Sequence, residues 1–419
     1  MAEFVQGMVI ESSLNRSDPW PSRVAIAQTF KHLSPSFPQS DVEPFVVFLV
    51  KEGALGDRET DVRRAMLDAG ASVVDLHGLS SLPGLISMFE GQLGGASTTE
   101  TQDQIQEAVV ILFGRLGRHL DPSDPRMPTL VERLVGALKT PAEQVQIAVA
   151  DCLAPLVNKM TSPIQQLVDR LLEDLAEAPK YAARRGAAYG LAGVIKGVGI
   201  QGIKKHGIFP RLKGYVEDKK KYEARQSAIM AFETMSATLT RTFEPYVIHV
   251  IPLLLAAFGD GTTEVREAAQ DAARVMMGNM SGYGVKLILP DLLSGLEEKQ
   301  WRTKKGSIEL LGMMAYCAPR QLSQSLPVVI PRLTGVLTDS HAQVKSSANK
   351  SLKQFGEVIS NPEIKALVPV FLKALVDPAK TPNALSALLK TSFMHYIDLS
   401  SLALVCVKDN VGEPTHGYS

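Results

Sequence analysis

The sequence predicts an all-α protein, a solenoid of about ten stacked helix pairs that repeats about every 40 residues. Three observations lead to this prediction. Apolar residues make up 45% of the 419 residues but aromatic residues only 6%, and this balance favours close-packed helices over β-sandwiches. One turn-and-helix motif recurs along the chain, and its copies are almost evenly spaced.

The motif is clearest in GDGTTEVREAAQDAARVM, where a turn at Asp260 precedes a helical pattern that opens with Val265 and Arg266. Copies follow Asp57 and Asp339, again with an apolar–basic pair beginning five residues later. The predicted second helices of the pairs start near Arg23, Val62, Gln106, Val145, Arg184, Arg225, Arg266, Lys304, Lys345 and Ala384. Neighbouring starts are 38 to 44 residues apart, which is the spacing of HEAT and armadillo repeats.

Another apolar helical segment precedes each second helix, and many of these segments contain a proline. Proline is tolerated in the first turn of a helix because its missing N–H would have no partner there. We therefore expect prolines to open the first helices of the pairs, at Pro128, Pro163, Pro252, Pro290, Pro331 and Pro369.

Three regions are expected: N-terminal HEAT repeats (1–177), further HEAT repeats (178–404) and a non-repeat tail (405–419). Stacked helix pairs share a continuous core and form a superhelix with a long inner surface. An apolar helix that starts near Asp398 has no partner helix after it. This indicates a fragment, or a variant whose end differs from that of a longer parent.

The three cysteines, Cys152, Cys317 and Cys406, are far apart, so neither a disulfide framework nor a zinc knuckle is expected. The N-terminus lacks the succession of basic, apolar and small residues that marks a signal peptide. The longest apolar run, residues 247–258, is too short to cross a bilayer. We expect a cytoplasmic protein that does not cross a membrane.

Gly197, Gly199 and Gly202 form a literal G-x-G-x-x-G, with Asp218 further along the chain. A dinucleotide site needs a strand before this motif, whereas the preceding AAYGLAGVIK has a helical pattern. The eight histidines never fall at helical spacing from one another, and no HExxH motif is present. We therefore expect no cofactor, no metal ion and no enzymatic activity.

The formal net charge is zero, but residues 178–226 hold 12 Lys and Arg against 3 Asp and Glu. Three second helices align as PKYAARRGAAYGL, KKYEARQSAIMAF and KQWRTKKGSIELL, each with an aromatic residue three positions before a base. These pairs are Tyr181 and Arg184, Tyr222 and Arg225, and Trp301 and Lys304. We expect Trp301 to pack between repeats.

One set of charged residues is expected to form a structural ladder, in which a base pairs with a turn acid of its own or a neighbouring repeat. This set comprises Asp57, Arg63, Asp260, Arg266, Asp339 and Lys345, with Lys304 belonging to the same ladder. A second set comprises candidates for binding a partner: Arg184, Arg185, Lys204, Lys205, Lys219, Lys220, Lys221, Arg225, Arg302 and Lys305. Acids are scarce in the sequence around several of them. Either a solvated face or a surface that binds nucleic acid or an acidic protein fits this pattern.

The residues from Arg184 onward, RRGAAYGLAGVIKGVGIQGIKKHGIFPRL, resemble the general control translational activator family. KKKYEARQSAIMAFE and EKQWRTKKGSIELLGMM resemble both that family and the HEAT domain of fungal elongation factor three. The resemblance is strongest over residues 179–404. It implies a non-enzymatic scaffold that docks on ribosomes, works with an ABC-type ATPase partner and helps to activate the amino-acid-starvation kinase of initiation factor two. The family's kinase-binding region lies beyond this segment, so no kinase-binding residues are expected here.

Periodicity alone leaves a second function open. A HEAT-repeat transport receptor or phosphatase scaffold, which binds only other proteins, would show the same helical repeat.

Overall fold

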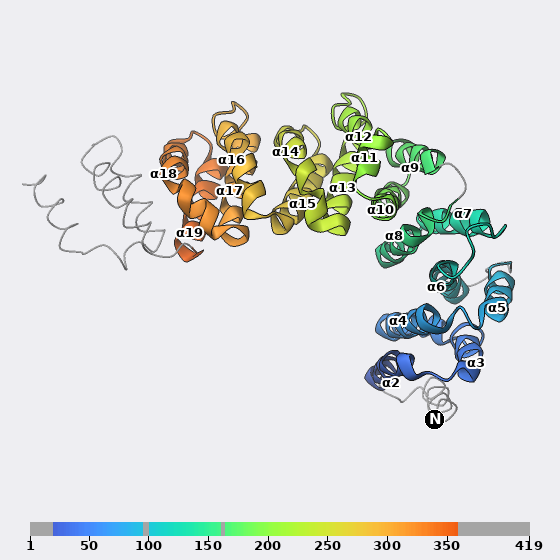
Figure 1. Cartoon of the computed structure of the whole chain (residues 1–419). Helices are drawn as coiled ribbons and strands as arrows, with labels where there is room; N and C mark the ends of the chain where they lie inside the picture. The colour runs from blue at the N-terminus through green and yellow to red at the C-terminus, as the bar shows by residue number, and fades with distance from the viewer. Residues whose placement is uncertain (1–19, 95–99, 161–163, 359–419) are drawn as a thin grey trace, which may run out of the picture. The chain divides into compact units, whose positions relative to one another are not determined.

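The computed structural model describes residues 20–94, 100–160 and 164–358, and every regular element within them is helical. The chain packs as two compact units, unit 1 (Met1–Arg211) and unit 2 (Leu212–Ser419). Each unit is a HEAT-repeat α-solenoid in which a first helix and a second helix alternate (Figure 1). The sequence-based division at residues 177 and 178 stays a prediction.

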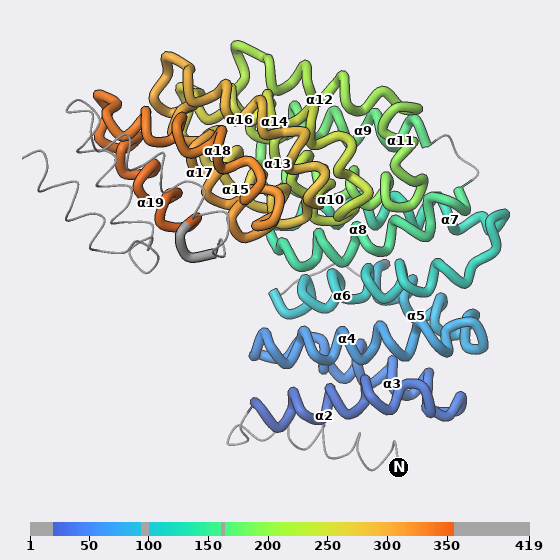
Figure 2. The backbone as a smooth tube through the Cα atoms, turned by 60° about the vertical axis from the view of Figure 1, so that its left-hand side comes forward, coloured from blue at the N-terminus to red at the C-terminus, as the bar shows by residue number. Residues whose placement is uncertain are grey.

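The described residues of unit 1 contain five second helices, which follow one another in chain order along the stack (Figure 2). They are α2 (Trp20–Leu33), α4 (Thr60–His77), α6 (Glu100–Gly117), α8 (Glu143–Val157) and α10 (Tyr181–Val198). The first helices between them are α3 (Gln39–Val50), α5 (Leu82–Gly94), α7 (Met127–Ala137) and α9 (Ile164–Glu177), and a short helix, α11 (Gln201–Lys205), follows α10. Single 3-10 turns, η1 (Ser34–Ser36) and η2 (Ala54–Gly56), flank α3.

Helix α12 (Ile208–Val216) leads from unit 1 into unit 2, in which first and second helices form two layers (Figure 1). The second helices are α13 (Tyr222–Leu239), α15 (Thr263–Asn279), α17 (Trp301–Cys317) and α19 (Ala342–Val358). The first helices are α14 (Glu244–Phe258), α16 (Gly282–Gly295) and α18 (Pro319–Gly335), with 3-10 turns η3 (Thr240–Phe243) and η4 (Val336–Thr338) beside them.

The predicted period is present in the structure. The second helices begin at residues 20, 60, 100, 143, 181, 222, 263, 301 and 342, so their spacing stays between 38 and 43 residues. Each start lies within a few residues of the predicted one, except near Gln106, where the helix begins at Glu100. The start predicted near Ala384 lies outside the described residues.

The expected role of the prolines is wrong for three of the first helices. Pro128 does lie in the first turn of α7, but Pro252, Pro290 and Pro331 lie inside α14, α16 and α18. An interior proline removes one helical hydrogen bond and costs about 3 kcal/mol. All three interior prolines are exposed, so their rings do not take up space in the core. Pro163 and Pro369 lie outside the described residues.

The stretch Tyr222–Phe258 is long and apolar enough to span a membrane by length and composition alone. It folds as two helices, α13 and α14, separated by the 3-10 turn η3. Their apolar side chains, such as Phe232, Ile251 and Leu254, are buried in the core of unit 2. The repeat core therefore accounts for the hydropathy of this stretch.

Glycines allow α10 to pack directly on α8 in unit 1. A Cβ atom added at Gly186 would lie 1.7 Å from the backbone oxygen of Leu138, in the turn before α8. Cβ atoms at Gly193 and Gly197 would lie 2.4 and 2.3 Å from the backbone oxygens of α8. Side chains at these positions would push the two helices apart, so the glycine-rich composition of residues 186–197 is a packing requirement.

At three places a turn aspartate ties one repeat to the repeat before it. Asp260 accepts a hydrogen bond from its own turn, from the Thr262 backbone N–H (2.8 Å), and a two-pronged ion pair from Arg225 of the preceding repeat (2.7 and 3.0 Å). The same arrangement joins Arg23 to Asp57 (2.9 Å) and Lys304 to Asp339 (2.8 Å). We call these three pairs the turn-aspartate ladder.

The bases of the ladder are not all the expected ones. Arg63 and Arg266 donate to backbone oxygens of their own turns, at Asp57 (2.6 Å) and Asp260 (2.7 Å), and neither forms an ion pair within the described residues. An aspartate must lie in the following turn for the base to reach it. The turn after Arg266 is LEEKQ, which carries no aspartate. Lys345 is exposed on α19, and no ion pair of its side chain lies within the described residues.

Two of the ladder aspartates, Asp260 and Asp339, have a lowered pKa. Burial by itself would raise the pKa of Asp260, but the hydrogen bonds from Arg225 and Thr262 outweigh burial and lower the pKa. The hydrogen bond from Lys304, with that from the His341 backbone, likewise lowers the pKa of Asp339. Because the folded-state pKa is depressed, the stabilisation is present above the unfolded-state pKa and is lost as the pH falls through the folded-state pKa.

Gly186→Ala is expected to lower the free energy of unfolding by about 3 kcal/mol or more, because α10 must move away from Leu138. Urea denaturation followed by circular dichroism measures this change. Gly136→Ala in α7 is the matched control, since its Cβ would meet no atom within 4 Å and alanine favours the helix by up to about 1 kcal/mol. Equal losses in both variants would contradict the packing argument.

Asp260→Asn is expected to lower the free energy of unfolding by about 2 kcal/mol at neutral pH. Below about pH 4 the difference from the wild type should begin to shrink, because the unfolded wild-type chain then binds a proton at Asp260. The difference should be lost once the pH falls through the lowered folded-state pKa of Asp260. Urea denaturation at several pH values measures both effects.

The control for that series is Asp271→Asn, which removes an exposed ion pair with Arg274 in the same repeat. Its effect should stay within about 0.5 kcal/mol at every pH. A loss in Asp260→Asn that persists undiminished at low pH would show that the ionised carboxylate is not the source of the stabilisation.

Candidate partner-binding surface

Four of the predicted partner-binding bases already have partners inside the chain. Arg184 is only 5% exposed and donates to the backbone oxygens of Ala178 and Pro179. Arg225 is a member of the turn-aspartate ladder. These two guanidinium groups therefore hold the turns of the solenoid in place.

The other two, Arg185 and Lys305, were expected to lie far from acids, and this expectation is wrong. The Arg185 guanidinium donates to the side-chain oxygen of Gln146 (2.9 Å) and lies 3.5 Å from Glu143, one repeat earlier. Lys305 lies 3.6 Å from Glu309, one turn further along its own helix. A local count of acids in the sequence misses Glu143 because it lies 42 residues before Arg185.

Gln146 gives Arg185 a fixed position. This amide is completely buried, and its nitrogen donates to backbone oxygens of Leu138 (3.0 Å), Thr140 (2.7 Å) and Ala182 (2.8 Å). Its oxygen is left to accept from Arg185. The network spans α8, its preceding turn and α10, so Arg185 contributes to contact between repeats.

The remaining candidate bases are exposed. Lys204 and Lys205 end α11 in unit 1, and Lys219, Lys220 and Lys221 form the turn between α12 and α13 in unit 2. The backbone N–H groups of Lys220 and Lys221 donate to Asp218 (2.7 and 3.0 Å), and these bonds lower the pKa of Asp218. The turn is thus fixed by its backbone, and its three lysines are exposed residues.

Trp301 packs between repeats, as expected. Its ring stacks on that of His341 in the next turn, with centroids 3.8 Å apart and an interplanar angle of 10°. The guanidinium carbon of the exposed Arg302 lies over the Trp301 ring, 4.6 Å from the ring centroid. In the equivalent position Tyr181 and Tyr222 are 47% and 38% exposed.

A shallow cationic hollow lies beside Trp301 in unit 2. Its lining includes Arg266 from α15 and Arg302 and Lys305 from α17. Phe258 and the acidic Glu309 also line it. Arg266 was predicted only as a structural residue. Sequence alignment places Arg266 and Arg302 in different repeats, and only the stacking of α17 on α15 brings them to one hollow.

The G-x-G-x-x-G motif serves helix packing. Gly197 faces the backbone of α8, and Gly199 ends α10 in a left-handed conformation (φ 83°) that favours glycine, with its N–H bonded to the Ile195 oxygen (2.9 Å). Gly202 lies in the short helix α11. A helix precedes the motif where a dinucleotide site has a strand. Across the described residues, no group of three or more His, Cys, Asp and Glu side chains is arranged to hold a metal ion.

Two family models match the chain. Residues 5–118 match the HEAT repeats of the stalled ribosome sensor GCN1, and residues 184–352 match the EF3 N-terminal HEAT repeat. The human stalled ribosome sensor GCN1 is 47% identical over 400 residues, and the Saccharomyces cerevisiae eIF-2-alpha kinase activator GCN1 is 44% identical over 404. Each alignment covers 95% of this chain but only 15% of the relative.

A solved structure of Kap95p with RanGDP has the same type of fold, with a TM-score of 0.50 over 92% of this chain and 51% of Kap95p. Its sequence identity is 13%, so this likeness concerns the fold alone. The two GCN1 alignments, by contrast, run through nearly the whole chain at more than 40% identity. The chain therefore belongs to the GCN1 family of HEAT-repeat proteins and corresponds to a segment about 15% as long as the relatives it matches.

Proposed function

We propose that this chain is a ribosome-docking scaffold segment of a translational activator. The observation that carries the proposal is the fixed turn from Lys219 to Lys221, in which all three lysines are exposed residues. This turn lies within the segment that matches the elongation factor model. Two relatives of the chain are described as a stalled ribosome sensor and an eIF-2-alpha kinase activator.

Ribosomal RNA is the chemical partner that such a turn fits best. Each lysine that neutralises a phosphate releases a bound counterion, so several lysines together give strong, salt-dependent binding with little sequence preference. Lys204 and Lys205 offer a similar contact in unit 1, and the cationic hollow with Arg302 offers one in unit 2. Contacts with acidic ribosomal proteins would add to these.

The proposed role is that of a scaffold, without catalysis of its own. It acts in the cytoplasm by holding the longer protein on the ribosome, so that the starvation kinase can be activated elsewhere on the molecule. An ABC-type ATPase is proposed as a further partner because the elongation factor match covers residues 184–352. The likeness to Kap95p gives no support to a transport function, since it is limited to the fold.

Reversal of Lys219, Lys220 and Lys221 to Glu is expected to weaken co-sedimentation with purified ribosomes by about tenfold or more at low salt. The dependence of the remaining binding on salt concentration should also become shallower. Replacement of the same lysines by Arg keeps the charge and should preserve binding.

A second control reverses three exposed lysines outside the predicted set, Lys286, Lys299 and Lys350. An unchanged sedimentation profile for the Lys219–221 variant would refute the proposed contact. An equal loss in both reversed variants would show a general effect of charge instead.

A further inference from the structure

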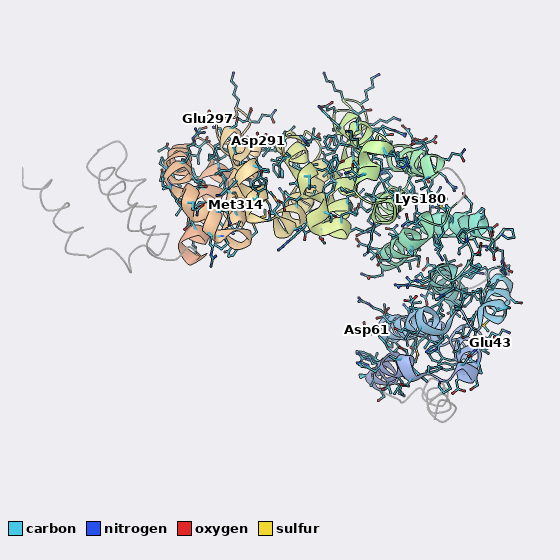
Figure 3. The ribbon with its side chains drawn as sticks, viewed as in Figure 1. Glu43, Asp61, Lys180, Asp291, Glu297 and Met314 are labelled. Atoms are coloured by element: carbon cyan, nitrogen blue, oxygen red, sulfur yellow. The ribbon has the colours of Figure 1, made fainter. Side chains whose placement is uncertain are left out.

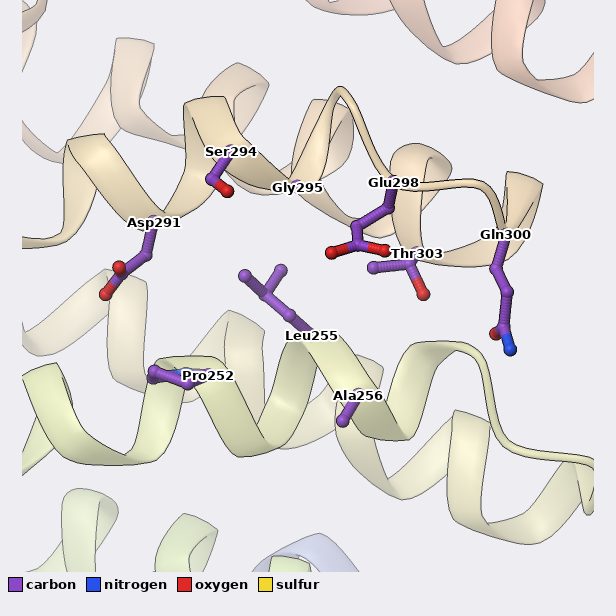
Figure 4. A pocket seen from close by; sticks show the side chains of 9 residues that line it. All are labelled: Pro252, Leu255, Ala256, Asp291, Ser294, Gly295, Glu298, Gln300 and Thr303. Atoms are coloured by element: carbon purple, nitrogen blue, oxygen red, sulfur yellow. The ribbon is translucent and has the colours of Figure 1, made fainter.

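A cleft of about 440 Å³ lies on the side of unit 2 formed by the first helices, between α14, α16 and the start of α17. Figure 4 shows it from close by, and Figure 3 places Asp291 on the α16 side of the unit. One wall is apolar and consists of Pro252, Leu255 and Ala256 from α14. The opposite wall carries two carboxylates, Asp291 on α16 and Glu298 in the turn that follows it.

The cleft occurs where the repeat changes its charge pattern. In three other first helices, this position holds an arginine that pairs with an acid in or just after the preceding first helix: Arg170 with Glu132, Arg211 with Asp169, and Arg332 with Glu297. A buried leucine follows each of these arginines, and the buried Leu292 follows Asp291 in the same register. Asp291 thus stands where these three repeats have a cation between neighbouring first helices.

The electrostatics of the cleft favour a positive group. Neither Asp291 nor Glu298 forms an ion pair within the described residues. The cleft also lies at the C-terminal ends of α14 and α16, whose last carbonyl groups carry partial negative charge. The first turn of α17 contributes the opposite partial charge, but it faces two helix ends and two full carboxylates.

A hydroxyl group in the same cleft supports this conclusion. Thr303 is only 8% exposed and lines the cleft, and its hydroxyl group makes no hydrogen bond within the described residues. The exposed amide of Gln300 lies on the same side (Figure 4). Together they offer neutral acceptors beside the carboxylates.

We propose that this cleft binds an arginine side chain from a peptide segment of a partner protein. The methylene groups of the arginine lie along Pro252 and Leu255, as such chains do on apolar surfaces. Its guanidinium group donates to Asp291 and Glu298 and to the Thr303 hydroxyl, and charge-assisted hydrogen bonds of this kind are the stronger ones. The partner thereby supplies the cation that α9, α12 and α18 supply from their own chain.

The site goes beyond ribosome docking, because its charge is opposite to that of the lysine turn. Phosphate groups of RNA would be repelled by the two carboxylates, so the occupant is a basic protein segment. Arginine fits better than lysine, since its planar donors can contact two carboxylates at once.

The test uses the full chain with isotope-labelled leucine methyl groups, and Leu255 in the cleft wall is the reporter. The probe is a short acetylated peptide that carries two arginines among alanines. Its neutral control replaces both arginines with citrulline, which keeps the shape but removes the charge. The arginine peptide should shift the Leu255 methyl signal in a saturable way, and the citrulline peptide should not.

The double variant Asp291→Asn with Glu298→Gln is expected to bind the arginine peptide about tenfold more weakly, or weaker still. Glu267→Gln, at an exposed position on α15 outside the cleft, should leave binding unchanged. Asp291→Arg replaces one carboxylate of the cleft with a cation that can pair with Glu298, and should abolish binding without lowering the melting temperature.

The proposal is overturned if Leu255 does not respond to the arginine peptide, or responds equally to the citrulline peptide. An equal loss in Glu267→Gln and in the double variant would show attraction to the overall surface charge, and would overturn it as well. So would an equal response of Leu255 to a short RNA.

Discussion

The turn aspartate is the group on which the repeat depends, because its carboxylate makes two contacts at once. One oxygen of Asp260 closes its own turn through the Thr262 N–H, while the same carboxylate receives the guanidinium group of Arg225 from the repeat before. The first contact fixes where the second helix begins. The second fixes the position of that helix along the neighbouring helix. One side chain therefore sets both the local turn geometry and the register between the two repeats.

This constraint also separates the bases that build the solenoid from those that remain for partners. Arg184, Arg185 and Arg225 use their donors on turns or on neighbouring repeats. The lysines at 219–221 are exposed residues and follow Asp218, whose carboxylate binds backbone N–H groups of that turn. At Asp291 the repeat loses a cation and an open cleft results. Candidate binding positions therefore lie where the repeat pattern is interrupted.

Much of the fold could be predicted from the sequence, because helical period and turn residues are local signals. The starts of the second helices followed from the apolar–basic pair after each turn. The proline assignment failed because a proline can also lie inside a helix, as Pro252 and Pro290 do on exposed faces of α14 and α16. The sequence contained Arg225 and Asp260, but not the stacking distance that joins a base to an acid 35 residues later. The cleft at Asp291 needed the same information about neighbouring helices.

A double-mutant cycle on Arg225 and Asp260 tests the central claim most directly. Free energies of unfolding are measured for Arg225→Gln, Asp260→Asn and the double variant at neutral pH. If the ion pair joins the two repeats, the two single losses are not additive, and the coupling energy is about 1 to 3 kcal/mol. Additive losses, with a coupling energy near zero, would contradict the account, since each residue would then act within its own repeat only.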